Sequence, residues 1–214
     1  DLGDIAGHVE AFGWKDALPE RFDMDLTAVA IAAARLTGDT ALGPISFTLV
    51  ASGDDLHGPS RKGSMTFAPS LLSYHHYDLS SLRLTAIATG DSMGVDLSSD
   101  ADGATLDLHA EGPWPEPGDS LALQFELAIV QLHLHELGLM PQVLNTEGRI
   151  TGRIALMPEQ RGRFTLQAPG LRVFNDDRSF TFERFTLYSL LDADSTALEL
   201  DCDVARVAYH ANLS

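Results

Sequence analysis

Two histidines and a glutamate near the middle of the chain have the residue types and spacing of metal ligands. In "QLHLHEL", residues 131–137, His133 and His135 are two positions apart and Glu136 follows. Side chains at i and i+2 of a strand project to the same face, so these three groups could hold a zinc ion. Metal-assisted chemistry is therefore the first hypothesis that the sequence raises.

The third ligand of such a site would come from elsewhere in the chain. His109 and the pair His75 and His76 in "YHHY" are the available histidines. The helical HExxH spacing of zinc proteases is absent from the sequence. We therefore expect no metal site, and no cofactor of another kind is indicated.

The competing interpretation of the same stretch is structural. The apolar positions change from odd to even numbers here, from Ile129 to Leu132 and Leu134. A bulge or a strand end produces such a change of phase. We expect a corner that ends a strand, with the leucines buried and both histidines facing solvent.

Other catalytic signatures are weak, and we expect no enzyme. Ser92 in "GDSMG" has the G-x-S-x-G spacing of a nucleophile elbow, but its copy in the internal repeat, "DADST", indicates a turn residue rather than a nucleophile. Neighbouring carboxylates could bind calcium, but they have no EF-hand or repeat-type spacing, so solvated turns are expected. These carboxylates are Asp54, Asp55, Asp100, Asp102, Asp176 and Asp177.

The composition describes an ordered, strongly acidic chain. Of the 214 residues, 44% are hydrophobic and 21% charged, and the net charge is −17. This charge excludes a general nucleic-acid surface and opposes adsorption to anionic lipid headgroups. Cys202 is the only cysteine, so the chain has no internal disulfide. No apolar run approaches the roughly 20 residues that span a bilayer.

Alternation of apolar and polar residues recurs along almost the whole chain. From 121 to 129, five large apolar residues alternate with smaller or polar ones, and runs of five to ten residues are closed by turn formers. Such a pattern is typical of half-buried antiparallel strands, and it predicts an all-β fold with few or no helices. The alanine-rich stretch at 25–36 suits either state, and we expect a strand there.

A weak internal repeat divides the chain into two units. Residues 83–100 and 186–203 are identical at five of eighteen aligned positions, including Leu84 with Leu187 and Leu97 with Leu200. Each copy predicts a three-stranded meander, with a proline-rich join at 111–120 between the copies. We therefore expect a first meander unit at 1–112 and a related second unit at 113–214, within one continuous domain.

The number of strands limits the architecture. Roughly sixteen to twenty strands are expected, more than an open twisted sheet holds without curling, splitting or closing. A membrane barrel would need girdles of Trp and Tyr, but only two Trp and four Tyr are present. A two-sheet sandwich or one long folded sheet remains. The repeat favours the long antiparallel sheet, on the order of 80 Å in length.

The central segment resembles a family of bacterial envelope proteins. The run "SYHHYDLSSLRLTAIATGDSMGVDLSSDADGATLDLHAEG" is similar to the TamB (translocation and assembly module) and AsmA-like proteins, in their Bacteroides-type form. "LHLHELGL" resembles a short element of that family, and "ALELDCDVARVAYHANLS" resembles its repeat ending, with Cys202 in place of Ser. Because the chain starts at Asp1 without Met, the resemblance suggests an excised segment of a longer, membrane-anchored protein.

The resemblance implies a fold and a function. The fold is a long sheet folded along its axis into a taco-like trough, apolar inside. The function is a periplasmic bridge, anchored in the inner membrane, that holds or conducts phospholipid acyl chains to the outer membrane. The alternative is a structural module that assists outer-membrane protein assembly by strand-edge pairing with a barrel of the Omp85 type. An enzyme or metal-dependent binding domain is the third class.

The apolar positions of the alternating runs are the candidate lining of a lipid groove. An acyl chain gains about 0.8 kcal/mol for each methylene that it buries, so a continuous apolar groove needs no headgroup chemistry. The predicted lining residues are Ile45, Phe47, Leu49, Met65, Phe67, Leu82, Leu84, Val95, Leu97, Leu106, Leu108, Leu121, Leu123, Phe125, Leu127, Ile129, Ile154, Leu156, Phe164, Leu166, Phe180, Phe182, Leu187, Leu198 and Leu200.

Overall fold

The fold of this chain is almost entirely β-structure. A computed structural model describes residues 2–15, 18–75, 77–115, 120–157, 161–192 and 195–212. The strands are β1 (Asp4–Phe12), β2 (Arg21–Ile31), β3 (Ile45–Asp54), β4 (Lys62–Leu71), β5 (Ser73–Tyr74), β6 (Tyr77–Asp78), β7 (Arg83–Thr89), β8 (Ser92–Ala101), β9 (Ala104–Pro113), β10 (Leu121–His133), β11 (Asn145–Met157), β12 (Arg161–Gln167), β13 (Leu171–Phe174), β14 (Ser179–Phe182), β15 (Phe185–Leu191), β16 (Ser195–Cys202) and β17 (Ala205–Asn212).

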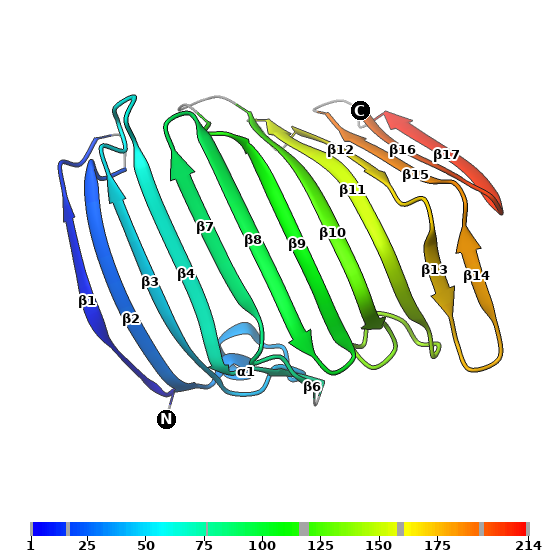
Figure 1. The fold of residues 1–214 in the computed structure, drawn as a ribbon, viewed down its shortest axis with the longest axis horizontal. Helices are drawn as coiled ribbons and strands as arrows, with labels where there is room; N and C mark the ends of the chain where they lie inside the picture. Colours follow the sequence, from blue (N-terminus) through cyan, green and yellow to red (C-terminus); the bar gives the residue numbers. More distant parts are fainter. Residues whose placement is uncertain are drawn as a thin grey trace.

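One large antiparallel sheet organises these strands (Figure 1). Fifteen strands belong to it, and thirteen follow one path in the order β1-β2-β3-β4-β7-β8-β9-β10-β11-β12-β15-β16-β17. The hairpin β13–β14 leaves this path from β11, and β5–β6 forms a separate pair. The sheet is open, with β1 and β17 at its two ends. This architecture confirms the predicted all-β class and the single antiparallel meander.

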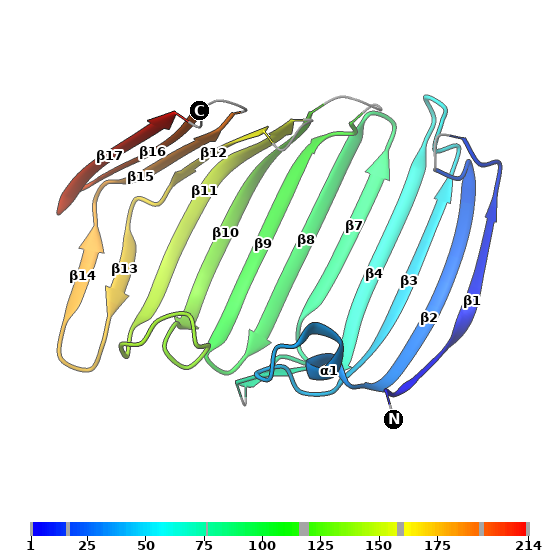
Figure 2. The ribbon, with the colours of Figure 1, turned by 180° about the vertical axis from the view of Figure 1, so that it is seen from behind.

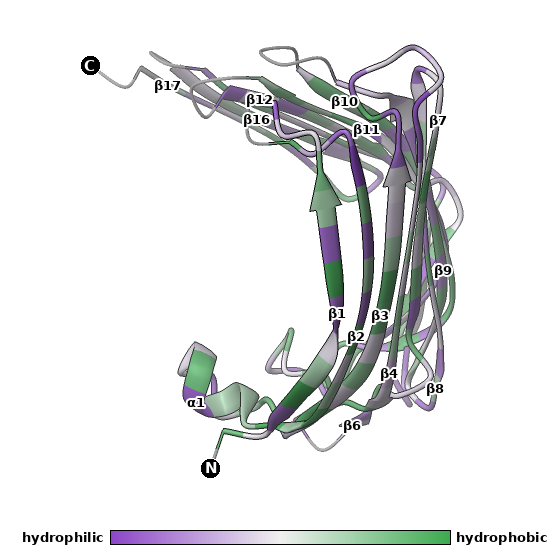
Figure 3. Cartoon of the chain, turned by 90° about the vertical axis from the view of Figure 1, so that its left-hand side faces the viewer, coloured by the Kyte–Doolittle hydropathy of each residue, from purple (hydrophilic) through white to green (hydrophobic). Residues whose placement is uncertain are grey.

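The path is shorter than the length expected from the number of strands. Thirteen strands at about 4.8 Å spacing extend for about 58 Å, because β5, β6, β13 and β14 lie outside the path. The sheet is also bent, and the strands curve along their length in the side view of Figure 3. The short helix α1 (Ala33–Thr37) lies on the hollow side of this bend, at the same end as the N-terminus (Figures 2 and 3).

The two copies of the repeat have corresponding positions in the sheet. The first copy forms β7 and β8 and the second forms β15 and β16, each pair followed by a third strand. Leu84 pairs with Leu97 in the first hairpin, and Leu187 pairs with Leu200 at the equivalent place in the second. β9 and β10 pair directly across the predicted join, so the sheet continues between the units. Residues 116–119 of the join lie outside the described residues.

The stretch at 25–36 differs from the expected strand. β2 ends at Ile31, after a bulge at which Ala30 takes a positive φ of 51°. The chain then forms α1, which ends where the Gly38 N–H donates to the Ala34 carbonyl at 3.0 Å. Alanine and arginine are strong helix formers, and glycine accommodates the left-handed residue that ends a helix. Once the bulge has ended the pairing of β2 with β3, the helix propensity of residues 33–37 therefore decides their structure.

The loop between β3 and β4 folds back over one face of the sheet. Its Leu56 is 4% exposed and lies over Gly53 and Gly63, which pair with each other. A Cβ added at Gly53 would lie 2.5 Å from the Phe22 ring and 2.9 Å from Leu56. At Gly63 the nearest atom is the Ser52 carbonyl oxygen at 3.6 Å. The absence of a side chain at Gly53 thus makes room for Leu56.

We predict opposite outcomes for alanine at these two paired glycines. Gly53→Ala should lower the free energy of unfolding by about 1–3 kcal/mol, because the methyl group overpacks Phe22 and Leu56. Gly63→Ala should be neutral or raise it by up to about 1 kcal/mol, because the added methyl group would make only ordinary van der Waals contacts and glycine weakens a strand. Urea denaturation measures both. Equal stability of the two variants would contradict this packing of Leu56.

Candidate functional site

The registers of the strands collect the large apolar side chains on one face, which we call the apolar face. One row of paired residues crosses the sheet from edge to edge and contains only apolar residues and glycine. Its members are Val9, Met24, Ala51, Met65, Ala86, Val95, Ala110, Phe125, Gly152, Leu166, Leu187, Leu200 and Val207. Because the pairing along this row has no one-residue slip, the alternating side chains of every strand keep their apolar members on the same face of the sheet.

A second row lies two residues further along each strand. It is made of large aliphatic and aromatic residues on eight successive strands, β2 to β11 along the path. These are Leu26, Leu49, Phe67, Leu84, Leu97, Leu108, Leu127 and Ile150. The two rows together form a continuous hydrocarbon surface with no charged residue in either row.

Nearly all of the predicted lining residues lie on this face. Alternation within the strands and the pairing registers place there the predicted residues of β3, β4, β7, β8, β9, β10, β11, β12, β15 and β16. Leu82 instead precedes β7 in a turn, where its N–H donates to the Leu79 carbonyl at 3.0 Å. Phe180 and Phe182 extend the face on the side hairpin through Val173, which pairs with Thr146. That these residues line a lipid groove stays a prediction.

The sequence-based set omitted several residues of the face. Phe22, Met24 and Leu26 belong to it, and the alternation in "RFDMDL" was the signal that could have included them. Ala51, Ala86 and Ala110 were missed because alanine carries little period-two signal. These alanines alternate with Met65, Val95 and Phe125 along the edge-to-edge row, so the surface is ridged.

The apolar face is not covered as a protein core would be. The buried hydrophobic residues are mostly alanines, and the only large side chain under 2% exposed is Pro69, among the described residues. The accessible surface is 13212 Å², whereas a compact monomer of 23.1 kDa exposes about 9,700 Å². The large side chains of the two rows, such as Leu97, Leu108 and Leu127, are half-buried rather than buried, which makes this face the candidate binding surface.

Short segments cover the two ends of the strands over this face. At one end Leu56 lies over Gly53 and Gly63. At the other end Leu137 is 8% exposed and packs with Ala101 and Ala104. The open part of the apolar face therefore runs across the strands, from β1 toward β17, between these two borders.

The opposite face is polar and chemically distinct. Arg149 and Glu126 form an ion pair of 2.7 Å there, and His109 Nδ1 lies 2.6 Å from the Asp96 carboxylate. The hydrogen bond that the His109 ring donates to the Asp96 carboxylate raises the pKa of His109 above its ordinary value, and the nearby charges of Asp96 and Glu111 add to the effect. A shallow hollow between β9 and β15 is lined by residues such as Gln124, Arg153 and Tyr188, which suit polar contacts rather than hydrocarbon.

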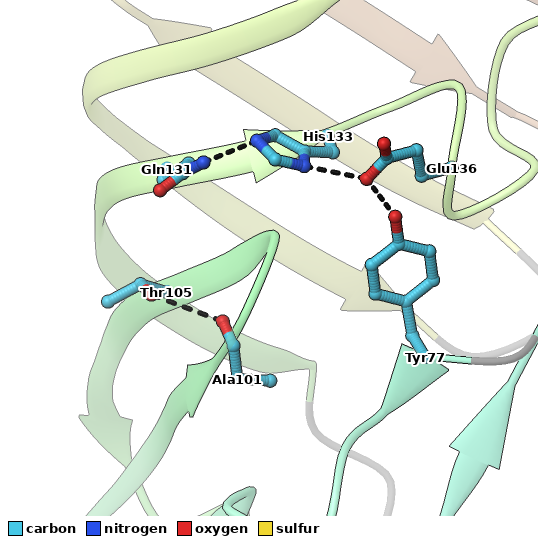
Figure 4. A network of polar contacts seen from close by, with 6 residues as sticks. All are labelled: Tyr77, Ala101, Thr105, Gln131, His133 and Glu136. Carbon is cyan, nitrogen blue, oxygen red and sulfur yellow. Dashed lines mark hydrogen bonds and ion pairs between the residues drawn. The ribbon is translucent and has the colours of Figure 1, made fainter.

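The histidines that suggested a metal have other roles (Figure 4). His133 ends β10, and its Nδ1 lies 2.7 Å from Glu136 Oε2. The Tyr77 hydroxyl donates to the same carboxylate oxygen, and the Gln131 amide contacts His133 Nε2.

This geometry corrects the expectation that both histidines face solvent. The His133 side chain is only 21% exposed, because the tyrosine and the glutamate close around it. His135 is exposed as predicted, and the bulge before Leu132 and the strand end at His133 are confirmed. His109 is held by Asp96, and His76 lies outside the described residues. No group of three or more His, Cys, Asp or Glu is placed to hold a metal ion in the described part of the chain.

Comparison with known proteins gives no match: no protein-family model, no curated protein and no solved structure matches this chain. No helix among the described residues has the length and hydropathy needed to cross a membrane. The function is therefore inferred from the geometry of the two faces.

We predict that the contacts of Glu136 hold the loop that follows β10. Tyr77→Phe and Glu136→Gln should each increase amide hydrogen exchange at residues 134–144, because each removes a charge-assisted hydrogen bond worth about 1.5–3 kcal/mol. Mass spectrometry of exchanged peptides measures the effect. Tyr209→Phe on β17 is the control and should leave the loop unchanged. Exchange at wild-type rates in both variants would show that the network does not hold the loop.

Proposed function

We propose that this chain is a non-enzymatic, periplasmic segment of a TamB/AsmA-like bridge between the inner and outer membranes. Its apolar face would line a taco-like trough that holds or conducts phospholipid acyl chains. The single observation that carries this proposal is the uncovered apolar face, whose central row runs through thirteen strands without a charged residue. The resemblance of the central segment to that family supports the proposal independently of the geometry.

The dimensions of the face suit lipid chains. The edge-to-edge row extends for about 58 Å, whereas one leaflet contributes about 15 Å of a bilayer's hydrocarbon core, so several chains fit in succession. Burial contributes about 0.8 kcal/mol for each methylene and requires no fixed geometry. Two ridged rows without polar side chains therefore hold an acyl chain in many nearly equivalent positions, which permits sliding.

The borders of the face give the sliding a direction. Leu56 and Leu137 cover opposite ends of the strands, so a chain on the open surface is guided across the strands rather than along them. Movement across the strands follows the long dimension of the sheet. A conduit between two membranes requires this direction.

A second function is favoured by the edges of the sheet. β1 ("DIAGHVEAF") and β17 ("ARVAYHAN") contain no proline or lysine, the residues that commonly protect an edge strand from pairing. Both edges can therefore accept further strands of a longer chain, or a strand of an outer-membrane barrel of the Omp85 type. In the second case the chain would be a structural module for outer-membrane protein assembly, and co-purification with such a barrel would test it.

We predict that acyl-chain binding depends on the apolar face and not on the polar one. The double variant Leu97→Thr/Leu108→Thr should bind a fluorescent fatty acid at least about tenfold more weakly, because it removes methyl groups from the paired centre of the face. Val50→Thr/Ile87→Thr is the matched control, since both residues are exposed on the opposite face. Fluorescence titration measures the affinities, and circular dichroism checks the fold.

Equal affinities of the two double variants would contradict a lipid site on the apolar face. Failure of the wild-type protein to bind the probe would remove the lipid-holding function altogether. If the wild-type protein binds no probe but binds an outer-membrane barrel specifically, the assembly function would be favoured.

A further inference from the structure

The loop between β10 and β11, residues 134–144, is a compact unit with its own internal bonds. The Leu134 N–H donates to the Leu144 carbonyl at 2.9 Å and closes the base of the loop. Inside it, the N–H groups of Leu139 and Met140 donate to the Leu134 carbonyl at 2.9 and 3.1 Å. Loops of this size with adjacent ends form self-packed surface units, and such loops are frequently functional. This loop can therefore move as one body about its base.

Few contacts attach this loop to the sheet. Leu137 packs on Ala101 and Ala104 of the apolar face, and Glu136 meets Tyr77 and His133. Gly138, with a φ of 70°, passes beneath the His75 ring, where a Cβ would lie 2.6 Å from His75 Nε2. Leu137 anchors the loop in a cluster with Ala101 and Ala104, whereas Leu139, Met140 and Val143 beyond it are exposed, and segments with few buried contacts open at a small fraction of the global stability.

The tip of the loop exposes apolar side chains. Leu139 is 61% exposed, Val143 54% and Met140 37%. Residues 137–146 contain no charged residue, although the chain as a whole carries a net charge of −17. Isolated exposed apolar residues are common, but three within five positions on an uncharged loop leave a surface that another apolar surface can cover.

The place of the loop relates this tip to the apolar face. Its Leu137 already lies against that face, at the end of the strands where β10 and β11 are joined (Figure 2). A rotation about the base at Leu134 and Leu144 would carry the tip inward over the same surface. The loop connects β10 and β11, and these two strands carry Leu127 and Ile150, which belong to the second row of the apolar face.

We propose that loop 134–144 is a lid that closes over a bound acyl chain and buries Leu139, Met140 and Val143 against it. The Tyr77–Glu136–His133 network holds the lid at its present position when the face is empty. The inference rests on the proposed lipid-holding function and adds a means of retaining the chain. The lid slows escape from the open side of the face while leaving movement across the strands possible.

The test measures how fast a bound chain leaves. Protein loaded with dansyl-labelled undecanoic acid is mixed in a stopped-flow instrument with excess oleate, and the loss of fluorescence gives the dissociation rate. Leu139→Ser/Val143→Ser should release the probe about tenfold or more faster than wild type, because the closed lid loses its apolar contacts. Val50→Ser/Ile87→Ser, exposed on the polar face, should release it at the wild-type rate.

A second readout separates the lid from the groove itself. In the wild-type protein the probe should protect residues 134–144 from hydrogen exchange, in addition to any protection of the strands. Probe binding with unchanged exchange in this loop, and equal release rates for the two double variants, would overturn the lid while leaving the lipid-holding function intact. Absence of probe binding to the wild type would overturn both.

Discussion

The constraint on which the whole structure depends is the register of one antiparallel sheet. Because successive side chains of a strand point to opposite faces, a slip of one residue anywhere along the path would move apolar residues to the polar face. The pairing instead stays in phase from Val9 on β1 to Val207 on β17. The irregularities at Ala28/Ile31, Ser46/Phe47 and Ile129/Leu132 lie toward the ends of the strands, outside the two central rows. The two faces therefore remain chemically separate.

This separation creates a surface that the described chain does not cover. A typical domain packs a second layer against the apolar face of its sheet. Here the additional segments are short, namely α1, the β3–β4 loop with Leu56, and the loop with Leu137. They border the ends of the strands and leave the middle open. A face with this shape is stable in water when hydrocarbon occupies it, which connects the fold to the proposed function.

The strands were largely predictable from the sequence because period-two alternation is a local signal. Leu121 to Ile129 and the repeated pairs Leu84/Leu97 and Leu187/Leu200 indicated both the strands and the face. The helix after Ile31 was not predicted, because alanine suits both states and only the bulge decides between them. The alanine positions of the face were missed for the same reason.

The environment of His133 could be predicted only in part, because Tyr77, which helps to enclose it, comes from a distant strand. Tyr77 reaches Glu136 across 59 residues of sequence, and only the path of the sheet brings β6 to the end of β10. The two borders of the apolar face also depend on contacts that only the folded sheet creates. Burial of Leu137 was expected from the sequence and that of Leu56 was not, but the role of both as borders depends on Gly53, Ala101 and Ala104 lying beneath them.

Native mass spectrometry of the protein purified gently from bacterial cells tests the lipid-holding role most directly, since it reports what occupies the apolar face. We predict monomers that carry phospholipid or fatty-acid masses, which are lost when the protein is delipidated by an organic solvent wash. A lipid-free monomer that takes up no acyl chain, or a lipid-free dimer that seals the two apolar faces against each other, would contradict this role.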